Sequence, residues 1–293
     1  MQRLVNPVNS KKLFTELVLK IHLNEPVDEI NRMILMLMEH EFGLITSEIL
    51  TGREVQWNLQ TESTWLEYIE RLNNNEPVQY IIGEADFYGR RFKVNRSVLI
   101  PRPETEELVY QVINRVKKDY PGGVKILDVG TGSGCIAITL KLELKQSEVF
   151  ATDISQRALQ VASQNARDHA ASVTFLHHDV LHDPIPMKNL DILVSNPPYI
   201  ARHEQVSLKP NVVEFEPHTA LFVEDVDPLL FYRALADQGK TALKHGGLAM
   251  VEINERLGHE TAEVFLQAGY NPVSVIPDLS GKDRIVIATH SPK

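Results

Sequence analysis

The chain has 293 residues, and its 30 basic and 39 acidic residues give a formal net charge of −9. This balance argues against a strongly basic nucleic-acid-binding protein. The single cysteine, Cys135, excludes an internal disulfide. The N-terminal sequence MQRLVNPVNSKKLF has no apolar run followed by a small-residue cleavage site, so we expect a cytoplasmic protein with no membrane partner.

The first 79 residues have the apolar spacing of amphipathic helices. Leu13, Leu17 and Ile21 recur at helical intervals, and the same spacing returns around Ile34 and Trp65. We therefore predict a small helical bundle as an N-terminal domain over residues 1–79. Helices alone leave two roles open for it, a folding accessory and a module that recognises a partner.

Residues 80–103 have a different pattern. Phe87, Phe92 and Val94 lie among glycines and polar residues, which predicts short strands joined by turns. We expect a β-hairpin linker between two domains. Pro103, which is followed by acidic residues, is a good helix start because acidic side chains favour the positive end of the helix dipole.

From residue 104 to residue 293, strand and helix patterns alternate. The predicted strands are 125–129, 148–151, 173–176, 191–194, 248–253, 272–276 and 284–288, and a helix is predicted over 157–166. Alternation of this kind predicts an α/β domain whose parallel sheet is covered by helices on both faces. Ligands bind such sheets at the carboxyl ends of the strands, so the candidate site residues are those that follow strands.

A glycine-rich turn follows the first of these strands. Asp128 lies near the end of the strand, and Gly130-Thr131-Gly132-Ser133-Gly134 leads into a helix, where the backbone can approach a ligand closely. The spacing G-x-G-x-G departs from the dinucleotide fingerprint G-x-G-x-x-G, which argues against a nicotinamide cofactor. An acidic residue just before such a turn resembles the first motif of S-adenosylmethionine enzymes. A merely tight structural turn is the alternative.

Two further aspartates follow the next two strands. Asp153 stands where a carboxylate commonly accepts hydrogen bonds from ribose hydroxyls. Ser155 can cap the following helix, and both roles can coexist. Asp179 is placed to accept a hydrogen bond from an adenine amino group, and its alternative is an ordinary loop aspartate.

A cluster of histidines with one more aspartate lies beside Asp179, namely His177, His178, His182 and Asp183. Histidine is the commonest metal ligand in proteins. These spacings do not give a helix-borne pair of ligands with a third defined ligand. We therefore expect polar residues at a strand exit and no metal cofactor.

The segment Ser195-Asn196-Pro197-Pro198-Tyr199 directly follows the apolar strand 191–194. Its prolines stiffen the turn, so the Asn196 side-chain oxygen and the Pro197 carbonyl can both accept hydrogen bonds from one external NH2 group. Tyr199 offers a flat face on which a planar group can stack. This arrangement suits an amide or aromatic amine, a poor nucleophile that must be oriented towards a methyl donor. A structural Pro-Pro turn is the alternative.

Further segments complete a pattern that extends over most of the chain. They are Pro77 to Gly83 (PVQYIIG), Phe87-Tyr88-Gly89, Phe92-Lys93-Val94, Val98 to Glu106 (VLIPRPETE), Glu214 to Pro217 (EFEP) and Asp278 to Arg284 (DLSGKDR). With these segments, the glycine-rich turn and the Asn-Pro-Pro-Tyr segment, the chain resembles the protein-(glutamine-N5) methyltransferases that modify peptide chain release factors. The Asn-Pro-Pro-Tyr segment alone is shared with amino-directed DNA methyltransferases.

The resemblance implies a seven-stranded, Rossmann-like class I methyltransferase domain over residues 104–293, with residues 1–79 recognising the substrate. It implies methyl transfer from S-adenosylmethionine, leaving S-adenosylhomocysteine, to the glutamine of a Gly-Gly-Gln loop in class-1 release factors, which tunes translation termination. The cofactor-binding residues it implies are Gly130, Thr131, Gly132, Ser133, Gly134, Asp153, Asp179, Val180 and Asn196. The glutamine-binding residues it implies are Asn196, Pro197, Pro198 and Tyr199, with Asn196, Pro197 and Tyr199 assigned to catalysis.

Two positions depart from the family pattern. Val180 lies where family members can have an aromatic residue beside the adenine. In Glu252-Ile253-Asn254, asparagine stands where glycine is expected, which leaves the role of that loop open.

Two other functions remain as alternatives. A DNA amino-methyltransferase, acting on adenine N6 or cytosine N4, would share the core but needs a basic surface that this composition does not indicate, so we expect no direct nucleic-acid contact. A non-catalytic adaptor would use the helical domain without needing both the glycine-rich turn and the Asn-Pro-Pro-Tyr segment.

Overall fold

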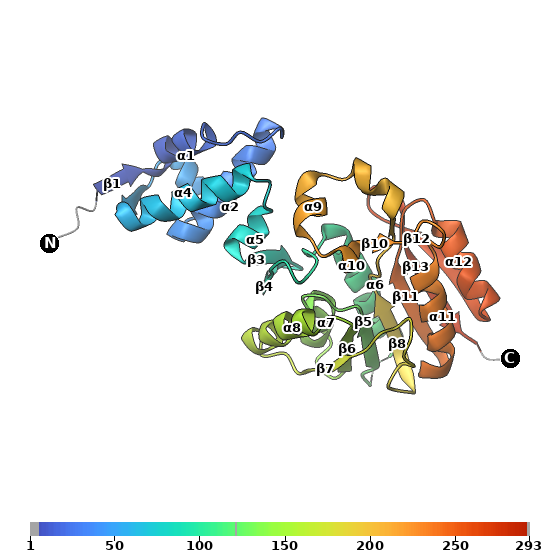
Figure 1. Cartoon of the computed structure of the whole chain (residues 1–293). Coiled ribbons are helices and arrows are strands. Elements are labelled where there is room, and N and C mark those ends of the chain that lie inside the picture. The colour runs from blue at the N-terminus through green and yellow to red at the C-terminus, as the bar shows by residue number, and fades with distance from the viewer. Residues whose placement is uncertain (1–5, 121, 292–293) are drawn as a thin grey trace. The chain divides into compact units, whose positions relative to one another are not determined.

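The computed structural model describes residues 6–120 and 122–291. The chain forms two compact units (Figure 1). The helical unit contains the chain up to Gly83 together with Lys209–Phe215, and the sheet unit contains Glu84–Leu208 and Glu216–Lys293. The predicted boundary at residues 79 and 80 lies within a short helix, α5 (Val78–Ile82), and the units divide just after it.

The helical unit is built around the apolar positions that the sequence indicates. Its helices are α1 (Ser10–Val18), α2 (Val27–Phe42), α3 (Thr46–Thr51), α4 (Leu59–Asn73), α5 and α9 (Pro210–Phe215). Leu17, Ile34 and Trp65 are buried in one cluster, so the predicted helical spacing is confirmed. A short antiparallel pair of strands, β1 (Asn6–Asn9) and β2 (Glu54–Trp57), was not predicted, because four residues are too few to show a clear alternation.

A seven-stranded sheet forms the centre of the sheet unit, with the strand order β12-β13-β11-β8-β5-β6-β7. Its strands are β5 (Lys125–Val129), β6 (Glu148–Asp153), β7 (Val173–His177), β8 (Leu190–Ser195), β11 (Leu243–Glu252), β12 (Tyr270–Pro277) and β13 (Asp283–His290). The prediction of an all-parallel sheet is wrong at one strand, since β13 runs antiparallel to both of its neighbours. Residues 278–282 alone join β12 to β13, and so short a connection cannot cross over the sheet to a parallel strand.

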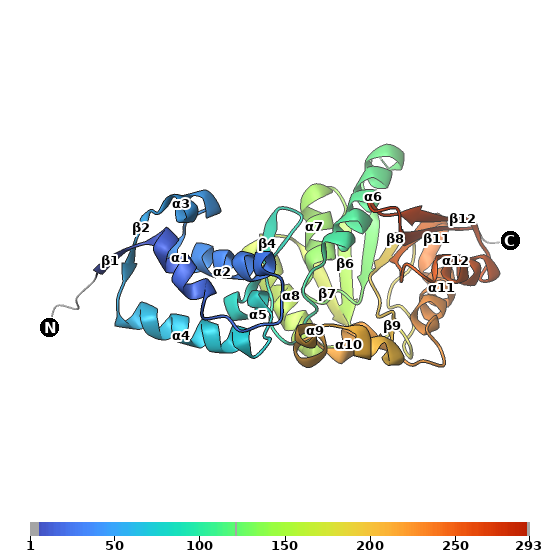
Figure 2. The same ribbon diagram turned by 90° about the horizontal axis from the view of Figure 1, so that it is seen from above.

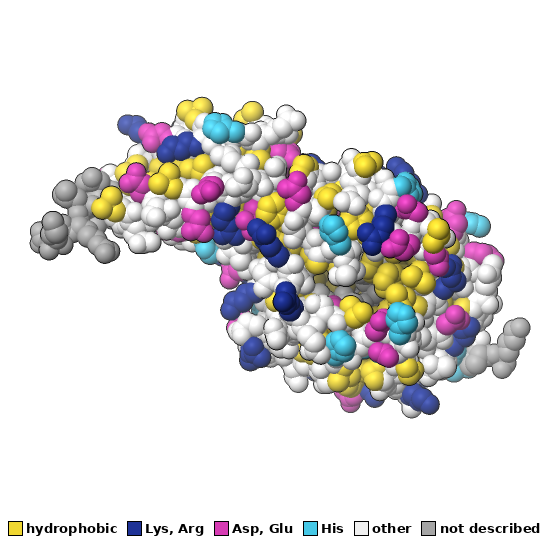
Figure 3. Space-filling model, viewed as in Figure 1, with side chains coloured by type: hydrophobic (Ala, Val, Ile, Leu, Met, Phe, Trp, Pro, Cys, Tyr) yellow, Lys and Arg dark blue, Asp and Glu magenta, His cyan; other side chains and the backbone are white. Residues whose placement is uncertain are grey.

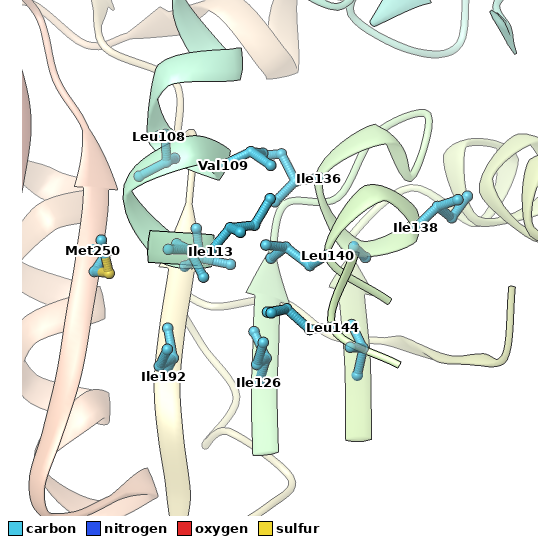
Figure 4. Close-up of a cluster of buried hydrophobic side chains, with 14 of the residues drawn as sticks. Leu108, Val109, Ile113, Ile126, Ile136, Ile138, Leu140, Leu144, Ile192 and Met250 are labelled. Atoms are coloured by element: carbon cyan, nitrogen blue, oxygen red, sulfur yellow. The ribbon is translucent and has the colours of Figure 1, made fainter. Parts of the chain in front are cut away.

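Helices cover both faces of this sheet, as predicted. They are α6 (Pro103–Asp119), α7 (Cys135–Glu143), α8 (Gln156–Asp168), α11 (Leu230–Ala242) and α12 (Gly258–Gln267), whereas the short helix α10 (His218–Leu221) directly precedes β10 (Phe222–Val223). Ile126, Ile192 and Met250 pack on one face with α6 and α7 (Figure 4). Their neighbours Leu127 and Leu193 pack on the other face with α11 and α12. Figure 2 shows the ribbons of these two helices beside β11. The central strands β5 and β8 are therefore buried on both sides, which explains their continuous apolar runs.

The predicted hairpin is present as the antiparallel strands β3 (Glu84–Phe87) and β4 (Arg90–Lys93). It belongs to the sheet unit, because Phe87 and Phe92 are fully buried in the same cluster as α6 and α7. Asn165 of α8 fixes its end by bonding both the N–H and the carbonyl of Lys93, at 2.7 and 3.0 Å. The sheet unit is completed by β9 (Ile200–Ala201), a 3-10 helix over Arg202–Ser207 and β10 (Phe222–Val223).

Candidate active site

The carboxyl ends of β5, β6 and β8 meet at a cavity of about 400 Å³ in the sheet unit. Eight of the residues predicted to form the site line this cavity: Gly130, Gly132, Asp153, Asp179, Val180, Asn196, Pro197 and Pro198. Figure 3 shows a hollow on this unit with hydrophobic side chains around it. A cavity with apolar walls and a few convergent polar groups is the usual form of a small-molecule site.

The glycine-rich turn is held by the neighbouring strand. The N–H groups of Gly130 and Thr131 both donate to the Thr152 carbonyl at 2.9 Å, and the Gly132 N–H donates to Asp153 Oδ2 at 2.8 Å. Gly130 has a φ of +75°, and a Cβ atom there would meet nothing within 4 Å. No side chain covers the backbone of Gly130 where it lines the cavity, so a ligand can approach this backbone closely.

The remaining residues of the turn support it from behind and are not among the residues that line the cavity. A Cβ atom at Gly134, where φ is +82°, would lie 2.9 Å from Ile138 Cδ1 and 3.0 Å from Ala162 Cβ, so this glycine allows α7 and α8 to pack closely. The Thr131 hydroxyl donates to Asp128 Oδ2 at 2.6 Å. Ser133 is buried, and its carbonyl accepts a hydrogen bond from Asn165 at 2.8 Å.

Two carboxylates lie under this turn. Burial raises the pKa of Asp128 to about 7, against the hydrogen bond from Thr131, and repulsion by Asp153 raises it further. Burial also raises the pKa of Asp153, although the N–H groups of Ser155 and Gly132 oppose the shift. A cation bound in the cavity would stabilise both ionised carboxylates, so the turn fits the positively charged methionine portion of S-adenosylmethionine.

Asp153 also has the structural role that the sequence left open. Its Oδ1 atom accepts the Ser155 N–H at 2.8 Å, and the Ser155 hydroxyl oxygen caps α8 by accepting the Ala158 N–H at 3.2 Å. The helix cap predicted at Ser155 is therefore confirmed. Each Asp153 oxygen accepts one backbone hydrogen bond from Ser155 or Gly132, and a carboxylate oxygen has capacity for a second.

The histidine cluster is held by hydrogen bonds to its own surroundings. His177 Nε2 lies 2.8 Å from the Ile154 carbonyl, and His182 Nδ1 lies 2.7 Å from Asp179 Oδ2. Burial would raise the pKa of Asp179, but the hydrogen bonds from His182 and the Leu181 N–H outweigh it and lower that pKa. Within residues 6–120 and 122–291, no group of three potential metal-ligating side chains comes together. The role of Asp179 towards an adenine stays a prediction.

The Asn-Pro-Pro-Tyr turn begins where β8 ends. The Ser195 hydroxyl donates to the Val129 carbonyl at 2.7 Å, which joins the ends of β8 and β5. Asn196 Nδ2 donates to Thr105 Oγ1 at 3.0 Å, and in the described part of the chain Asn196 Oδ1 accepts no hydrogen bond. Asn196 lines the cavity, so its carbonyl oxygen is available to an NH2 group there.

Tyr199 is half-buried and is not among the residues that line the cavity. Its hydroxyl donates to Glu252 Oε1 at 3.2 Å, and its ring packs against the apolar cluster shared by the sheet and α11. Burial and the neighbouring Glu252 raise the pKa of Tyr199, so the phenol stays protonated. Stacking of a planar ligand on this ring stays a prediction.

Comparison with known proteins shows the family to which this chain belongs. Residues 20–83 match the PrmC N-terminal domain, and residues 111–215 match the methyltransferase small domain. The release factor glutamine methyltransferase of Bacteroides thetaiotaomicron is 41% identical, over 90% of this chain and 94% of its own. That of Bacillus subtilis is 38% identical, over 91% of this chain and 93% of its own. The chain belongs to the release factor glutamine methyltransferase family.

The family assignment confirms the resemblance seen in the sequence, and a solved structure supports the fold. A methyltransferase from Pyrococcus furiosus superposes with a TM-score of 0.51 at 17% sequence identity, over 76% of this chain and 98% of its own. The predicted class I methyltransferase fold is therefore confirmed. None of the described helices of this family member has the length and apolarity needed to cross a membrane.

Two buried residues of this methyltransferase complete the site and were not predicted. Thr105 at the start of α6 is 3% exposed, and its hydroxyl donates to Glu252 Oε2 at 2.6 Å; Glu252 at the end of β11 is 1% exposed. Burial raises the pKa of Glu252 to about 7, although the hydrogen bond from Thr105 opposes the shift. The sequence offers one indication for each, since Thr105 lies in the Pro-Glu-Thr-Glu segment and Glu252 lies near the carboxyl end of a predicted apolar strand.

Other segments of the family pattern have structural roles in the sheet unit. Glu216 is buried, where it accepts the Ile100 N–H at 3.2 Å and a hydrogen bond from Arg102 at 2.6 Å. Asp278 accepts hydrogen bonds from Arg284 and from the N–H groups of the turn between β12 and β13. Glu216 thus fixes segments next to Leu99 and Pro217, which line the cavity, while Asp278 fixes the turn between β12 and β13.

Proposed function

We propose that the protein transfers a methyl group from S-adenosylmethionine to the side-chain amide nitrogen of the glutamine in the Gly-Gly-Gln motif of class-1 peptide chain release factors. The family of the chain supports this proposal. The observation that carries it is that one cavity is lined both by the glycine-rich turn with Asp153 and by Asn196 and Pro197. The residues predicted to bind the methyl donor and those predicted to bind its acceptor therefore face the same space.

The cofactor would be held by Gly130, Gly132 and Asp153, with the adenine near Asp179 and Val180. When bound, S-adenosylmethionine supplies an electrophilic methyl group on a positively charged sulfur. The carboxylates of Asp128 and Asp153 favour that charge before transfer. Asp153, which lines the cavity, and Asp128, which is buried behind the turn, thus prepare one side of the cavity for the methyl donor.

The other side of the cavity orients the acceptor. Asn196 Oδ1 would accept one amide hydrogen of the glutamine and the Pro197 carbonyl the other, which directs the nitrogen towards the methyl group. Asparagine has no group that titrates near neutral pH, so Asn196 acts by orientation and not as a base. Because the amide nitrogen is a weak nucleophile, positioning is the main contribution that these side chains can make. As the N–CH3 bond forms, the S–CH3 bond of the donor would break to leave neutral S-adenosylhomocysteine, and the excess proton of the amide would pass to solvent after the transfer.

The direct test offers three substrates to the wild-type protein with S-adenosylmethionine labelled in its methyl group. They are an intact class-1 release factor, the same factor with its motif glutamine changed to asparagine, and duplex DNA. We expect label on the glutamine of the first substrate alone, located by fragment mass spectrometry. Label in the DNA would support a DNA amino-methyltransferase, and no transfer to any substrate would support the adaptor alternative.

We further propose that the helical unit docks the release factor. A glutamine in a short loop offers little surface for recognition, and the helical unit exposes several large apolar side chains, including Leu19, Val27, Ile45, Leu59 and Leu66. A truncated protein should begin at Glu84, because starting near Ile100 would remove the buried Phe87 and Phe92 from the core of the sheet unit.

The truncated protein should bind S-adenosylmethionine and methylate a short Gly-Gly-Gln peptide at the wild-type rate, but lose methylation of the intact release factor. The peptide serves as the matched control for the chemistry. If the truncated protein methylates the intact factor at the full rate, the helical unit is a folding accessory.

A further inference from the structure

A buried polar chain lies behind the Asn-Pro-Pro-Tyr turn and joins three segments that are far apart in the sequence. Asn196 Nδ2 donates to Thr105 Oγ1 at 3.0 Å, Thr105 Oγ1 donates to Glu252 Oε2 at 2.6 Å, and the Tyr199 hydroxyl donates to Glu252 Oε1 at 3.2 Å. Glu252 and Thr105 are almost fully buried, so water does not compete for these bonds. This series of hydrogen bonds therefore limits which side-chain atom of Asn196 can face the cavity.

The direction of these hydrogen bonds follows from the single hydrogen of a threonine hydroxyl. When Glu252 is ionised its carboxylate can only accept, so Thr105 gives this hydrogen to it, across 2.6 Å. Thr105 Oγ1 can then only accept from Asn196. The amide branch of Asn196 that faces Thr105 must accordingly be its NH2 group, and the carbonyl oxygen is left for the cavity.

If the side-chain amide of Asn196 were flipped, so that its NH2 group and its oxygen exchanged places, it would not orient the acceptor. Its NH2 group would face the NH2 group of a bound glutamine, and neither group can accept a hydrogen bond. We propose that Thr105 and Glu252 are positioning residues which act through Asn196, by fixing its side-chain amide with Oδ1 towards the acceptor nitrogen. This inference rests on the proposed function for the identity of the acceptor, but not for the orientation of Asn196.

The surroundings of Glu252 act on its charge in opposite directions, so both its ionised and its protonated form are accessible near neutral pH. The titratable groups that face it are Glu104 of α6, Tyr199 of the turn, Tyr232 of α11 and Arg284 of β13. Burial raises the pKa of Glu252 to about 7, while Thr105, Arg284 and Tyr199 each favour the ionised form. Glu252→Gln keeps the shape of the side chain but replaces an obligatory acceptor by an amide, which can reverse the chain of hydrogen bonds.

A purely structural role for Thr105 is the competing explanation, since it lies buried in the first turn of α6. The variants that separate the two roles are Thr105→Val, which removes the hydroxyl at constant shape, Thr105→Ser, which keeps it, and Glu252→Gln. Thr261→Val is the matched control, because Thr261 is buried in α12 and its hydroxyl has no hydrogen-bond partner in the described part of the chain.

The first measurement is the single-turnover rate of methyl transfer to the release factor, with S-adenosylmethionine saturating. We expect Thr105→Val and Glu252→Gln to lower this rate about tenfold without weakening cofactor binding, and Thr105→Ser to restore most of it. In an Asn196→Ala background, Thr105→Val should have no further effect. An undiminished rate in Thr105→Val, or the same tenfold loss in both backgrounds, would overturn the inference.

The second measurement does not depend on the substrate. In protein labelled with nitrogen-15 at asparagine, the side-chain NH2 signals of Asn196 are identified by their loss in Asn196→Ala. We expect slowed hydrogen exchange of these signals in the wild type, Thr105→Ser and Thr261→Val, and fast exchange in Thr105→Val. Identical exchange in Thr105→Val and the wild type would contradict the inference, even if the release factor is methylated.

The two measurements separate the inference from the proposed function. If the wild type fails to methylate the release factor while the Asn196 signals respond to Thr105→Val as expected, the substrate assignment is wrong and the orientation of Asn196 stands. If the wild type is active and the signals do not respond, the proposed function stands and the positioning roles are wrong.

Discussion

The two loops of the active site are held in different ways. The glycine-rich turn after β5 is fixed by backbone and carboxylate groups of the next strand, such as the Asp153 carboxylate that accepts the Gly132 N–H, 21 residues away. The Asn-Pro-Pro-Tyr turn after β8 is fixed by side chains from distant parts of the chain. Thr105 is 91 residues from Asn196, and Glu252 is 53 residues from Tyr199.

This difference matches the two tasks of the loops. A cofactor with charged and polar groups can be held by a bare backbone and neighbouring carboxylates, so the first loop needs an approachable surface. A weakly nucleophilic amide must be held in one orientation, so the second loop needs a fixed acceptor atom. We therefore expect substitutions in the first loop to change cofactor affinity, and those in the second to change the rate of transfer.

The largest effect is expected at Asn196. Asn196→Ala should lower the single-turnover rate about a hundredfold at saturating S-adenosylmethionine, because a misplaced reacting atom can cost this much. Asn196→Asp retains an acceptor oxygen but adds a charge, and it should also be slow. Rapid-quench measurement of methylated release factor checks both variants. A near-wild-type rate in Asn196→Ala would remove it from the chemistry.

The next effect concerns two glycines of the first loop. Gly134→Ala should lower the free energy of unfolding by about 2 kcal/mol, because its Cβ atom would press against Ile138 and Ala162 and a positive φ disfavours alanine. Gly130→Ala has the strain without the clash and should cost about 1 kcal/mol. Urea unfolding of both variants tests this order. Equal losses would show that packing at Gly134 is not important.

A smaller effect is expected on cofactor affinity. Asp153→Ala should weaken S-adenosylmethionine binding about tenfold, because it removes a hydrogen-bond acceptor and loosens the Gly132 backbone. Asp168→Ala on the surface of α8 is the matched control and should bind normally. Isothermal titration calorimetry gives both affinities, and an unchanged value for Asp153→Ala would place Asp153 outside the cofactor site.

The smallest effect is a dependence of the transfer rate on pH. Burial raises the pKa of Glu252 to about 7, so the carboxylate that sets the hydrogen bonds of Asn196 is ionised above that pH and protonated below it. The single-turnover rate should therefore rise severalfold between about pH 6 and about pH 8. In Glu252→Gln this rise should be absent. A rise that persists in the variant would assign it to another group.

The sequence was sufficient to predict the elements whose support is local. The strand that contains Asp128, the helix cap at Ser155 and the helix start at Pro103 all depend on neighbouring residues, and each is present. The reversal of β13 was not predicted, because a parallel and an antiparallel buried strand have the same apolar pattern. The direction of β13 follows from the short connection before it, because residues 278–282 are too few to cross over the sheet.

The side of the site that depends on tertiary contacts could not be predicted in the same way. Thr105 was covered by the pattern of a helix start, and Glu252 was named only as part of a loop of unknown role. Their connection arises because β11 and β8 pair in the sheet while α6 packs across them. Tyr199, whose predicted role as a stacking platform stays a prediction, also directs its hydroxyl to Glu252. Local spacing contains no information about such partners.

The central claim is that the two loops divide cofactor binding from acceptor orientation, and one titration tests it most directly. S-adenosylmethionine is titrated by calorimetry into Asn196→Ala, the variant with the largest expected loss of rate. We predict a dissociation constant within about twofold of the wild type, because the first loop is held without Asn196. A dissociation constant weakened about a hundredfold, in step with the rate, would contradict the division of roles.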